Sequence, residues 1–259
     1  RRQCQSYQTA AAQGPRCQPR PVLHVRRCHD YKGDIDHPNI RCRLVAPETR
    51  ARSSIDAANT FAATPPLEAV KLLLSLATFG NTGLDQSDWK VVGFYDISRA
   101  HFNAVAEREV YTTLPDEMAE DGYCAKLKRT MYGTQDAAKL WGEMWAKHLE
   151  EQGMKIGLSS RSLFCDEWRR GMCHGDDFIV VGSEKSVKAF GSILEDMFEV
   201  KLVGLIGFQQ HLDKELRALN RLVRCNVKAD RMEVEADPRH VELLLRDLGM
   251  EKCKPVQLP

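Results

Sequence analysis

Hydrophobic residues recur with helical spacing in four segments of the chain. Between Gln135 and Glu151 they line one face of the segment, and Gly153 follows as a helix terminator. Ser183 before one segment, and Asp237-Pro238 before another, are residue types that favour helix starts. The pattern therefore predicts helices over about 67–78, 135–151, 183–197 and 237–249.

Short runs of β-branched and aromatic residues between these segments predict strands. The runs cover residues 91–96, 109–113, 162–166, 171–181, 198–202, 221–226 and 232–235. The third and fourth runs are expected to form one hairpin, and the last two another around Ala229-Asp230. Because strands and helices alternate without a repeated βαβ unit, the expected fold class is α+β with a mostly antiparallel sheet.

Charge is distributed unevenly along the chain, although the net charge is only +1. Residues 1–52 contain eleven Lys or Arg and four Asp or Glu, so the rest of the chain carries a net charge of −6. Residues 1–36 are rich in Gln, Arg, Pro and Ala without a period, which predicts a poorly ordered basic leader. The leader is interpreted as a solvated tail or, alternatively, as an arm that contacts phosphates.

The sequence offers no support for a membrane or secreted protein. No apolar run approaches the ~18 residues that a spanning helix needs. The chain begins at Arg1 without Met and without an apolar signal segment, which suggests a fragment of a longer reading frame.

Nine Cys without a CxxC pair indicate a reducing intracellular setting, in a cytoplasmic particle or the nucleus. A zinc site at Cys17, His24, Cys28 and His29 is disfavoured because their spacing matches no standard ligand pattern.

Three aspartates stand at predicted strand ends. Asp96 ends the run Val-Val-Gly-Phe-Tyr-Asp, and eighty residues later Asp176-Asp177 follows the turn residue Gly175. Such carboxylates can hold two divalent metals about 3.5–4 Å apart, as in-line phosphoryl transfer requires. Hard oxygen ligands select Mg²⁺ or Mn²⁺. Adjacent Asp residues are also common turn formers, so the pattern alone leaves both interpretations open.

Blocks around these aspartates resemble, in the same order, the reverse transcriptases of copia-type LTR retrotransposons. The blocks are Arg43-Leu-Val-Ala46, Phe61-Ala-Ala-Thr-Pro65, Asp96-Ile-Ser-Arg-Ala-His-Phe-Asn103, Val110-Tyr-Thr-Thr-Leu-Pro115, Cys124 to Trp141, Ser162-Leu-Phe164 and Phe198-Glu-Val-Lys-Leu-Val-Gly204. The resemblance covers roughly residues 31–259. It implies an RNA-directed DNA polymerase with fingers, palm and thumb that uses two Mg²⁺ ions, with Mn²⁺ as a substitute.

The resemblance assigns the catalytic chemistry to the aspartates. It implies that Asp96 and Asp176 are the main metal ligands and that Asp177 supports them. It also implies a nucleotide-binding role for five residues: Arg41, Arg43, His101, Tyr132 and Gly133. The two arginines have guanidinium groups that suit the triphosphate, although solvated strand arginines are an equally weighted interpretation. Lys201 is a weaker candidate for proton donor to the leaving group.

The resemblance further implies a division of the chain and a set of partners. Partial fingers are expected over about 37–90, the palm, with its antiparallel sheet and flanking helices, over about 91–205, and a thumb-like or connection region over about 206–259. The expected partners are an RNA or DNA template with its primer, and dNTPs. Integrase and ribonuclease H, other parts of such a polyprotein, are expected outside this chain.

The chain departs from the family pattern at several positions. His174-Gly175 replaces Tyr-Val before the paired aspartates, and His174 is interpreted as a packing or hydrogen-bonding substitute rather than a ligand. His101 replaces an aromatic ring that excludes a 2′ hydroxyl, so weaker rejection of ribonucleotides is expected. Asp136 replaces Gln and Ala138 replaces Pro; an extra carboxylate near the template path argues against activity.

Two alternative functions are considered. The altered motifs and irregular leader also fit a catalytically inactive retrotransposon relic with at most nucleic-acid binding. The triplet Gly175-Asp-Asp177 also occurs in viral RNA-dependent RNA polymerases. Those enzymes need a second Asp five positions after the aspartate that corresponds to Asp96. This chain has His101 at that position, so this alternative is disfavoured.

Overall fold

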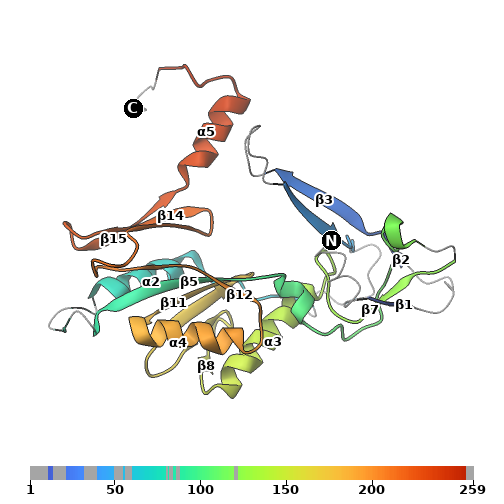
Figure 1. Ribbon diagram of the computed structural model, residues 1–259, viewed down its shortest axis with the longest axis horizontal. Coiled ribbons are helices and arrows are strands. Elements are labelled where there is room, and N and C mark those ends of the chain that lie inside the picture. Colours follow the sequence, from blue (N-terminus) through green and yellow to red (C-terminus); the bar gives the residue numbers. More distant parts are fainter. Residues whose placement is uncertain are drawn as a thin grey trace. The chain divides into compact units, whose positions relative to one another are not determined.

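The structure is a computed structural model that describes residues 11–13, 22–31, 40–49, 55, 60–79, 81, 84–85, 88–119 and 122–254 (Figure 1). Its contacts divide the chain into two compact units. The first comprises Arg1–Pro65, Ile97–Phe164 and His174–Asp176, and the second comprises Pro66–Asp96, Cys165–Cys173 and Asp177–Pro259. The α+β class predicted from the sequence is confirmed, because helices and antiparallel sheets occur together.

An antiparallel sheet forms the centre of the second unit, with strand order β12-β5-β11-β10. These strands are Val200–Ile206 (β12), Lys90–Ile97 (β5), Asp177–Ser183 (β11) and Arg170–His174 (β10). Consecutive residues Val91–Tyr95 of β5 are all buried, so both faces of this strand are covered. Helices α2 (Leu67–Phe79) and α4 (Glu184–Glu195) both pack against β11.

Helix α4 begins as its sequence predicts and locks onto β5. The Ser183 hydroxyl accepts a hydrogen bond from the Ser186 backbone N–H at 3.3 Å, which caps the helix. The Tyr95 hydroxyl donates to the Val187 carbonyl at 2.6 Å. A methyl group at Gly93 would lie 2.4 Å from Cγ1 of Val187, so only glycine permits this approach.

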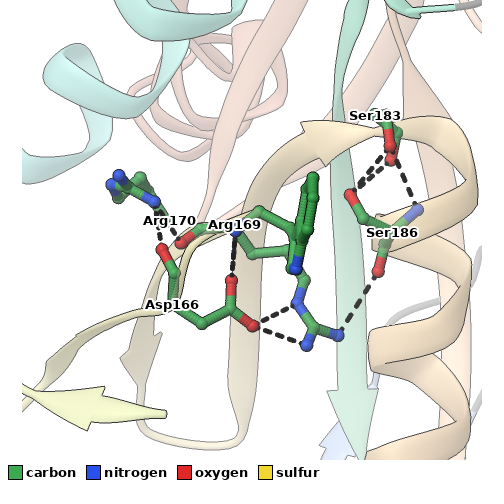
Figure 2. A network of polar contacts seen from close by, with 6 residues as sticks. Asp166, Arg169, Arg170, Ser183 and Ser186 are labelled. Carbon is green, nitrogen blue, oxygen red and sulfur yellow. Dashed lines mark hydrogen bonds and ion pairs between the residues drawn. The ribbon is translucent and has the colours of Figure 1, made fainter.

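A charged network holds the loop before β10 against α4 (Figure 2). The Asp166 carboxylate accepts hydrogen bonds from the Arg169 backbone N–H at 2.6 Å and from its guanidinium at 2.6 and 2.8 Å. Arg169 in turn donates to the Ser186 carbonyl at 3.4 Å. Burial raises the pKa of Asp166, but the hydrogen bonds from Arg169 outweigh it and the pKa is lowered overall. This ion pair is therefore charged and fixed at neutral pH.

The C-terminal part of the second unit contains a separate antiparallel sheet, β13-β14-β15, and a helix. The elements are Glu215–Ala218 (β13), Arg221–Asn226 (β14), Arg231–Ala236 (β15) and Pro238–Asp247 (α5). Asp237 caps α5 by accepting from the Arg239 backbone N–H at 3.1 Å. Hydrogen bonds from the Arg239 side chain are the largest cause that lowers the pKa of Asp237 to about 2. The helix therefore starts at a carboxylate that stays charged.

The first unit is built from short strands around a small apolar core. Its elements are Ala11–Gln13 (β1), Val22–Leu23 (β2), Arg26–Tyr31 (β3), Ile40–Val45 (β4), Ala100–Asn103 (η4), Tyr111–Thr112 (β6), Asp116–Met118 (η5), Ala125–Leu127 (β7), Ala137–Glu151 (α3), Lys155–Ile156 (β8) and Leu163–Cys165 (β9), which ends in the second unit. Four of these strands form the sheet β1-β7-β6-β2, β3 and β4 form an antiparallel ribbon, and β9 and β8 continue the strand order after β10. Leu44 from the ribbon, Leu127 from the sheet and Met131 share the core.

All four predicted helices are present, but the N-terminal strands were missed. Within the predicted leader, residues 11–13 and 22–31 form β1, β2 and β3, where no period had indicated an element. The rest of residues 1–36 lies outside the described part of the chain, as does Cys17 of the disfavoured zinc site. The described cysteines are free thiols. Across the described ranges, none of the helices has the length and apolar character to span a bilayer.

Candidate functional site

Asp96 and Asp177 are brought together by the pairing of β5 with β11 in the second unit. The antiparallel register makes Asp96 the direct partner of Asp177, next to the pair Tyr95 and Phe178. Directly opposed residues project from the same side of a sheet with Cβ atoms about 4.5–5.5 Å apart. Both aspartates are partly exposed, whereas Tyr95 and Phe178 are buried. The sheet therefore ends in two carboxylates on one face.

Asp176 belongs to the first unit, in the turn that connects β10 to β11. Gly175 adopts a left-handed φ of +67°, which glycine accepts without steric penalty. The Gly175 carbonyl accepts a hydrogen bond from the indole N–H of Trp141 in α3 at 2.7 Å. The Asp176 carbonyl accepts from the Ile97 backbone N–H at 2.9 Å. The backbone of the turn is thus held on both sides, while the Asp176 side chain stays partly exposed.

The donor chemistry of the three aspartates fits a hard divalent cation. Carboxylate oxygens are the ligands that Mg²⁺ and Mn²⁺ prefer. Among the residues that the structure describes, however, no three His, Cys, Asp or Glu side chains are gathered closely enough to hold a metal ion. The register brings two of the aspartates together, and the metal-binding role of all three stays a prediction.

His101 and Tyr132 form a stacked pair in the first unit. Their ring centroids are 4.5 Å apart with an interplanar angle of 28°, and Phe102 packs edge-on against Tyr132. Burial is the main cause that lowers the pKa of His101, and the charge of Asp176 opposes it. The Nδ1 atom of His101 is buried and has no hydrogen-bond partner within the described residues. The ring is therefore a neutral, flat surface that interacts electrostatically with the Asp176 carboxylate.

The end of β4 is hydrogen-bonded to the loop that contains Tyr132 and Gly133. The Ala46 backbone N–H donates to the Tyr132 carbonyl at 2.8 Å, and the Glu48 N–H donates to the Gly133 carbonyl at 3.1 Å. Gly133 has a φ of +96°, and a Cβ atom there would lie 2.7 Å from the Ala46 carbonyl oxygen. The position therefore requires glycine for both conformation and space.

The remaining predicted residues have different settings. Arg43 is exposed on β4, three residues before Ala46, and Arg41 is the register partner of Asp30. Lys201 is exposed on β12, and its role as a proton donor stays a prediction. His174 is exposed at the end of β10. Its role as a packing or hydrogen-bonding substitute stays a prediction.

Asp136 does not stand as a solitary carboxylate near a template path. It is buried at the start of α3 and accepts hydrogen bonds from Nε and Nη2 of Arg108 at 2.8 and 3.0 Å. Arg108 also binds Glu48, which sequence reasoning missed together with Arg108. These residues are separated by 28 and 60 positions, so no local pattern could have paired them.

Comparisons with known proteins agree with the motifs. A family model described as reverse transcriptase (RNA-dependent DNA polymerase) matches residues 18–223. The chain is 22% identical over 236 residues to a retrovirus-related Pol polyprotein from transposon TNT 1-94 of Nicotiana tabacum, covering 88% of this chain and 16% of that protein. It is 23% identical over 164 residues to the corresponding polyprotein from transposon RE1 of Arabidopsis thaliana, covering 61% of this chain and 11% of that protein.

A solved structure with a similar fold is that of apo telomerase from Candida tropicalis. The TM-score is 0.51 at 10% sequence identity, and the match covers 91% of this chain and 52% of that chain. At this identity the likeness concerns the fold alone. The chain spans less than a fifth of the length of the two Pol polyproteins it matches.

Proposed function

This chain belongs to the reverse transcriptase (RNA-dependent DNA polymerase) family, and we propose that it is the polymerase domain of a retrotransposon Pol polyprotein. Its reaction would join a dNTP to the 3′ hydroxyl of a primer on an RNA or DNA template. The observation that carries the proposal is the direct register of Asp96 with Asp177, within a chain matched over residues 18–223 by this family. The sequence adds Asp176 immediately before Asp177.

Each group of residues has a role in the proposed reaction. Asp96 and Asp176 would hold two divalent ions, with Asp177 in support. Bound Mg²⁺ or Mn²⁺ supplies Lewis-acid activation of the attacking hydroxyl and neutralises charge on the triphosphate. The carboxylates keep these charges in place, so that little reorganisation is needed during transfer.

The stacked rings and the fingers arginines would bind the nucleotide. The neutral face of His101, supported by Tyr132, offers a flat surface for the sugar. The loop at Gly133 lies against the end of β4, which brings the strand of Arg43 to the same region of the first unit. A guanidinium there suits an oxygen-rich triphosphate. Arg41 is included by its place in the same strand.

A catalytically inactive polymerase relic is the second candidate. It is supported by the absence of a three-ligand metal cluster among the described residues and by the altered motif around His174. Such a protein would bind nucleic acid at most. An RNA-copying RNA polymerase is not retained, because the matching family makes DNA.

Primer extension separates the candidates. The protein is incubated with a primed RNA template, dNTPs and Mg²⁺, alongside the Asp176→Asn variant. The polymerase proposal expects extension by the wild type and its loss in the variant. No extension by the wild type, or equal extension by both proteins, would favour the relic.

A further inference from the structure

Arg108 joins two carboxylates in the first unit. Its Nη1 atom donates to Oε1 of Glu48 at 2.9 Å, and a second hydrogen bond joins Nη2 to Oε2 of Glu48 at 2.5 Å. Its Nε and Nη2 atoms donate to Asp136 at 2.8 and 3.0 Å. The side chain of Arg108 is 27% exposed, that of Glu48 4% and that of Asp136 12%. The guanidinium therefore uses its planar fork on both acids in a largely buried setting.

Both acids are connected to the residues that follow the Tyr132–Gly133 loop. The Glu48 carboxylate also accepts from the Gln135 backbone N–H at 3.0 Å, and the Glu48 backbone N–H donates to the Gly133 carbonyl at 3.1 Å. Asp136 precedes the first turn of α3 and lies three residues after Gly133. The loop is thus hydrogen-bonded to the end of β4, and Asp136, which follows the loop, is bound to Arg108.

Arg108 itself follows the segment that carries His101. The backbone after η4 is hydrogen-bonded to the strand that leads into the loop, through Thr130 N–H to the Ala104 carbonyl at 2.9 Å and Ala106 N–H to the Lys128 carbonyl at 3.1 Å. Arg108 therefore connects three chain segments, near residues 48, 108 and 136. Without it, two buried carboxylates would face each other without a counter-charge, which is strongly unfavourable.

From this geometry we propose that Arg108 is a positioning residue for the nucleotide site. By binding Glu48 and Asp136 together, it fixes the Tyr132–Gly133 loop and thereby the face of Tyr132 on which His101 stacks. The inference rests on the proposed function, since the bound nucleotide is a dNTP. It also gives a role to Asp136, which replaces an uncharged residue of the family motif.

Arg108→Lys is the primary test variant, because lysine keeps the charge but cannot bind both carboxylates through a planar fork. Arg224→Lys is its matched control. Arg224 also binds two carboxylates, Glu215 at 2.7 Å and Glu235 at 2.5 Å, but all three side chains are exposed by 37–52%. The double variant Arg108→Asp with Asp136→Arg restores the pair with reversed charges.

Two measurements read the loop and the site separately. Hydrogen exchange follows the Gln135 and Glu48 amides, and the dissociation constant is measured for Mg²⁺-bound dATP and for a primed RNA duplex. For Arg108→Lys, loop exchange and the dATP dissociation constant are each expected to rise roughly tenfold to a hundredfold. Duplex affinity should stay near the wild-type value. Arg224→Lys should change none of these, and the reversed pair should recover part of the loss.

The outcomes distinguish a failure of this inference from a failure of the proposed function. Unchanged loop exchange in Arg108→Lys would overturn the inference. So would faster exchange with unchanged dATP affinity, or an equal loss of dATP and duplex binding together with a lower thermal midpoint. A wild-type protein that binds no dATP would overturn the proposed function. The role of Arg108 in fixing the loop would then be decided by the exchange measurement alone.

Discussion

Asp96 on β5 is the direct register partner of Asp177 on β11, at the end of a strand pair whose next residues inward, Tyr95 and Phe178, are buried. Because the two aspartates are partly exposed and the next residues inward are buried, the accessible polar groups of this strand pair lie at its end. Apolar side chains hold the strands against α4, and carboxylates occupy the last paired positions. A shift of one residue in the register would move every side chain of β5 to the opposite packed face, so core packing on both faces protects the alignment of the aspartates.

The loop at Gly133 provides a test of local geometry. We predict that Gly133→Ala destabilises the protein by about 1–3 kcal/mol, because alanine is strained at positive φ and its methyl group meets the Ala46 carbonyl. Gly142→Ala in α3 is the control, since the nearest atom to its new Cβ is 4.0 Å away. It should stabilise the helix by about 0.5–1 kcal/mol. Urea unfolding measures both; equal effects of the two substitutions would contradict this account of Gly133.

Tyr95 should show its burial in an alkaline titration. Burial is the main cause that raises the pKa of its hydroxyl to about 12. Its contribution to stability is therefore complete below the ordinary value of 10 and is lost as the pH rises towards 12. Tyr95→Phe should remove a tyrosine that titrates near pH 12 in absorbance at 295 nm, and should cost about 1 kcal/mol through the lost bond to Val187. A titration curve unchanged by the substitution would disprove the assignment.

The smaller ring of His101 should relax sugar selection. We predict that the ratio of ribonucleotide to deoxyribonucleotide incorporation is at least about tenfold higher for the wild type than for His101→Tyr. The reason is that the phenol of the variant fills space that a 2′ hydroxyl would occupy. Competing incorporation of dATP and ATP into a primed template measures the ratio. Equal discrimination by the two proteins would remove this role of His101.

The start of α5 should respond to acid. The pKa of Asp237, lowered to about 2 mainly by Arg239, means that its stabilising effect is present above the ordinary value near 3.8 and lost as the pH falls through about 2. Asp237→Asn keeps a side-chain oxygen that can cap α5 but loses the charge that pairs with Arg239, so it should remove this acid dependence. Amide exchange of residues 239–242 between pH 2 and 5 provides the measurement. An acid dependence that survives in the variant would refute this role of the Asp237 charge.

Elements that depend on short-range signals were predicted from the sequence more completely than elements that depend on long-range pairing. Ser183 and Asp237 start α4 and α5 as expected, because caps are short-range signals. Strands β2 and β3 were missed, since β2 has two residues and β3, Arg-Arg-Cys-His-Asp-Tyr, shows no apolar alternation. The pairing of β2 with β6 depends on a partner distant in the chain, whereas β3 pairs with β4, the next strand along the chain.

The same distinction holds for the candidate site. Asp96, Asp176 and Asp177 could be found because strand ends and a glycine turn mark them in the sequence. The stacking of His101 on Tyr132 depends on two segments about thirty residues apart, and only the fold brings the rings together. Arg108, Glu48 and Asp136 are joined in the same way, so the sequence that suggested an extra carboxylate at Asp136 gave no local sign of its pairing with Arg108.

The central claim is that these aspartates make the chain an RNA-directed DNA polymerase. The most direct test is the rate of single dNTP incorporation on a primed RNA template with Mg²⁺, compared among Asp96→Asn, Asp176→Asn and the control Asp230→Asn. Asp230 lies exposed in the turn between β14 and β15, away from the register pair on its own unit's main sheet. The account predicts incorporation by the wild type and the control, and a loss of at least about 10³-fold in the other two. Absent wild-type incorporation, or rates that do not depend on Asp96 and Asp176, would contradict it.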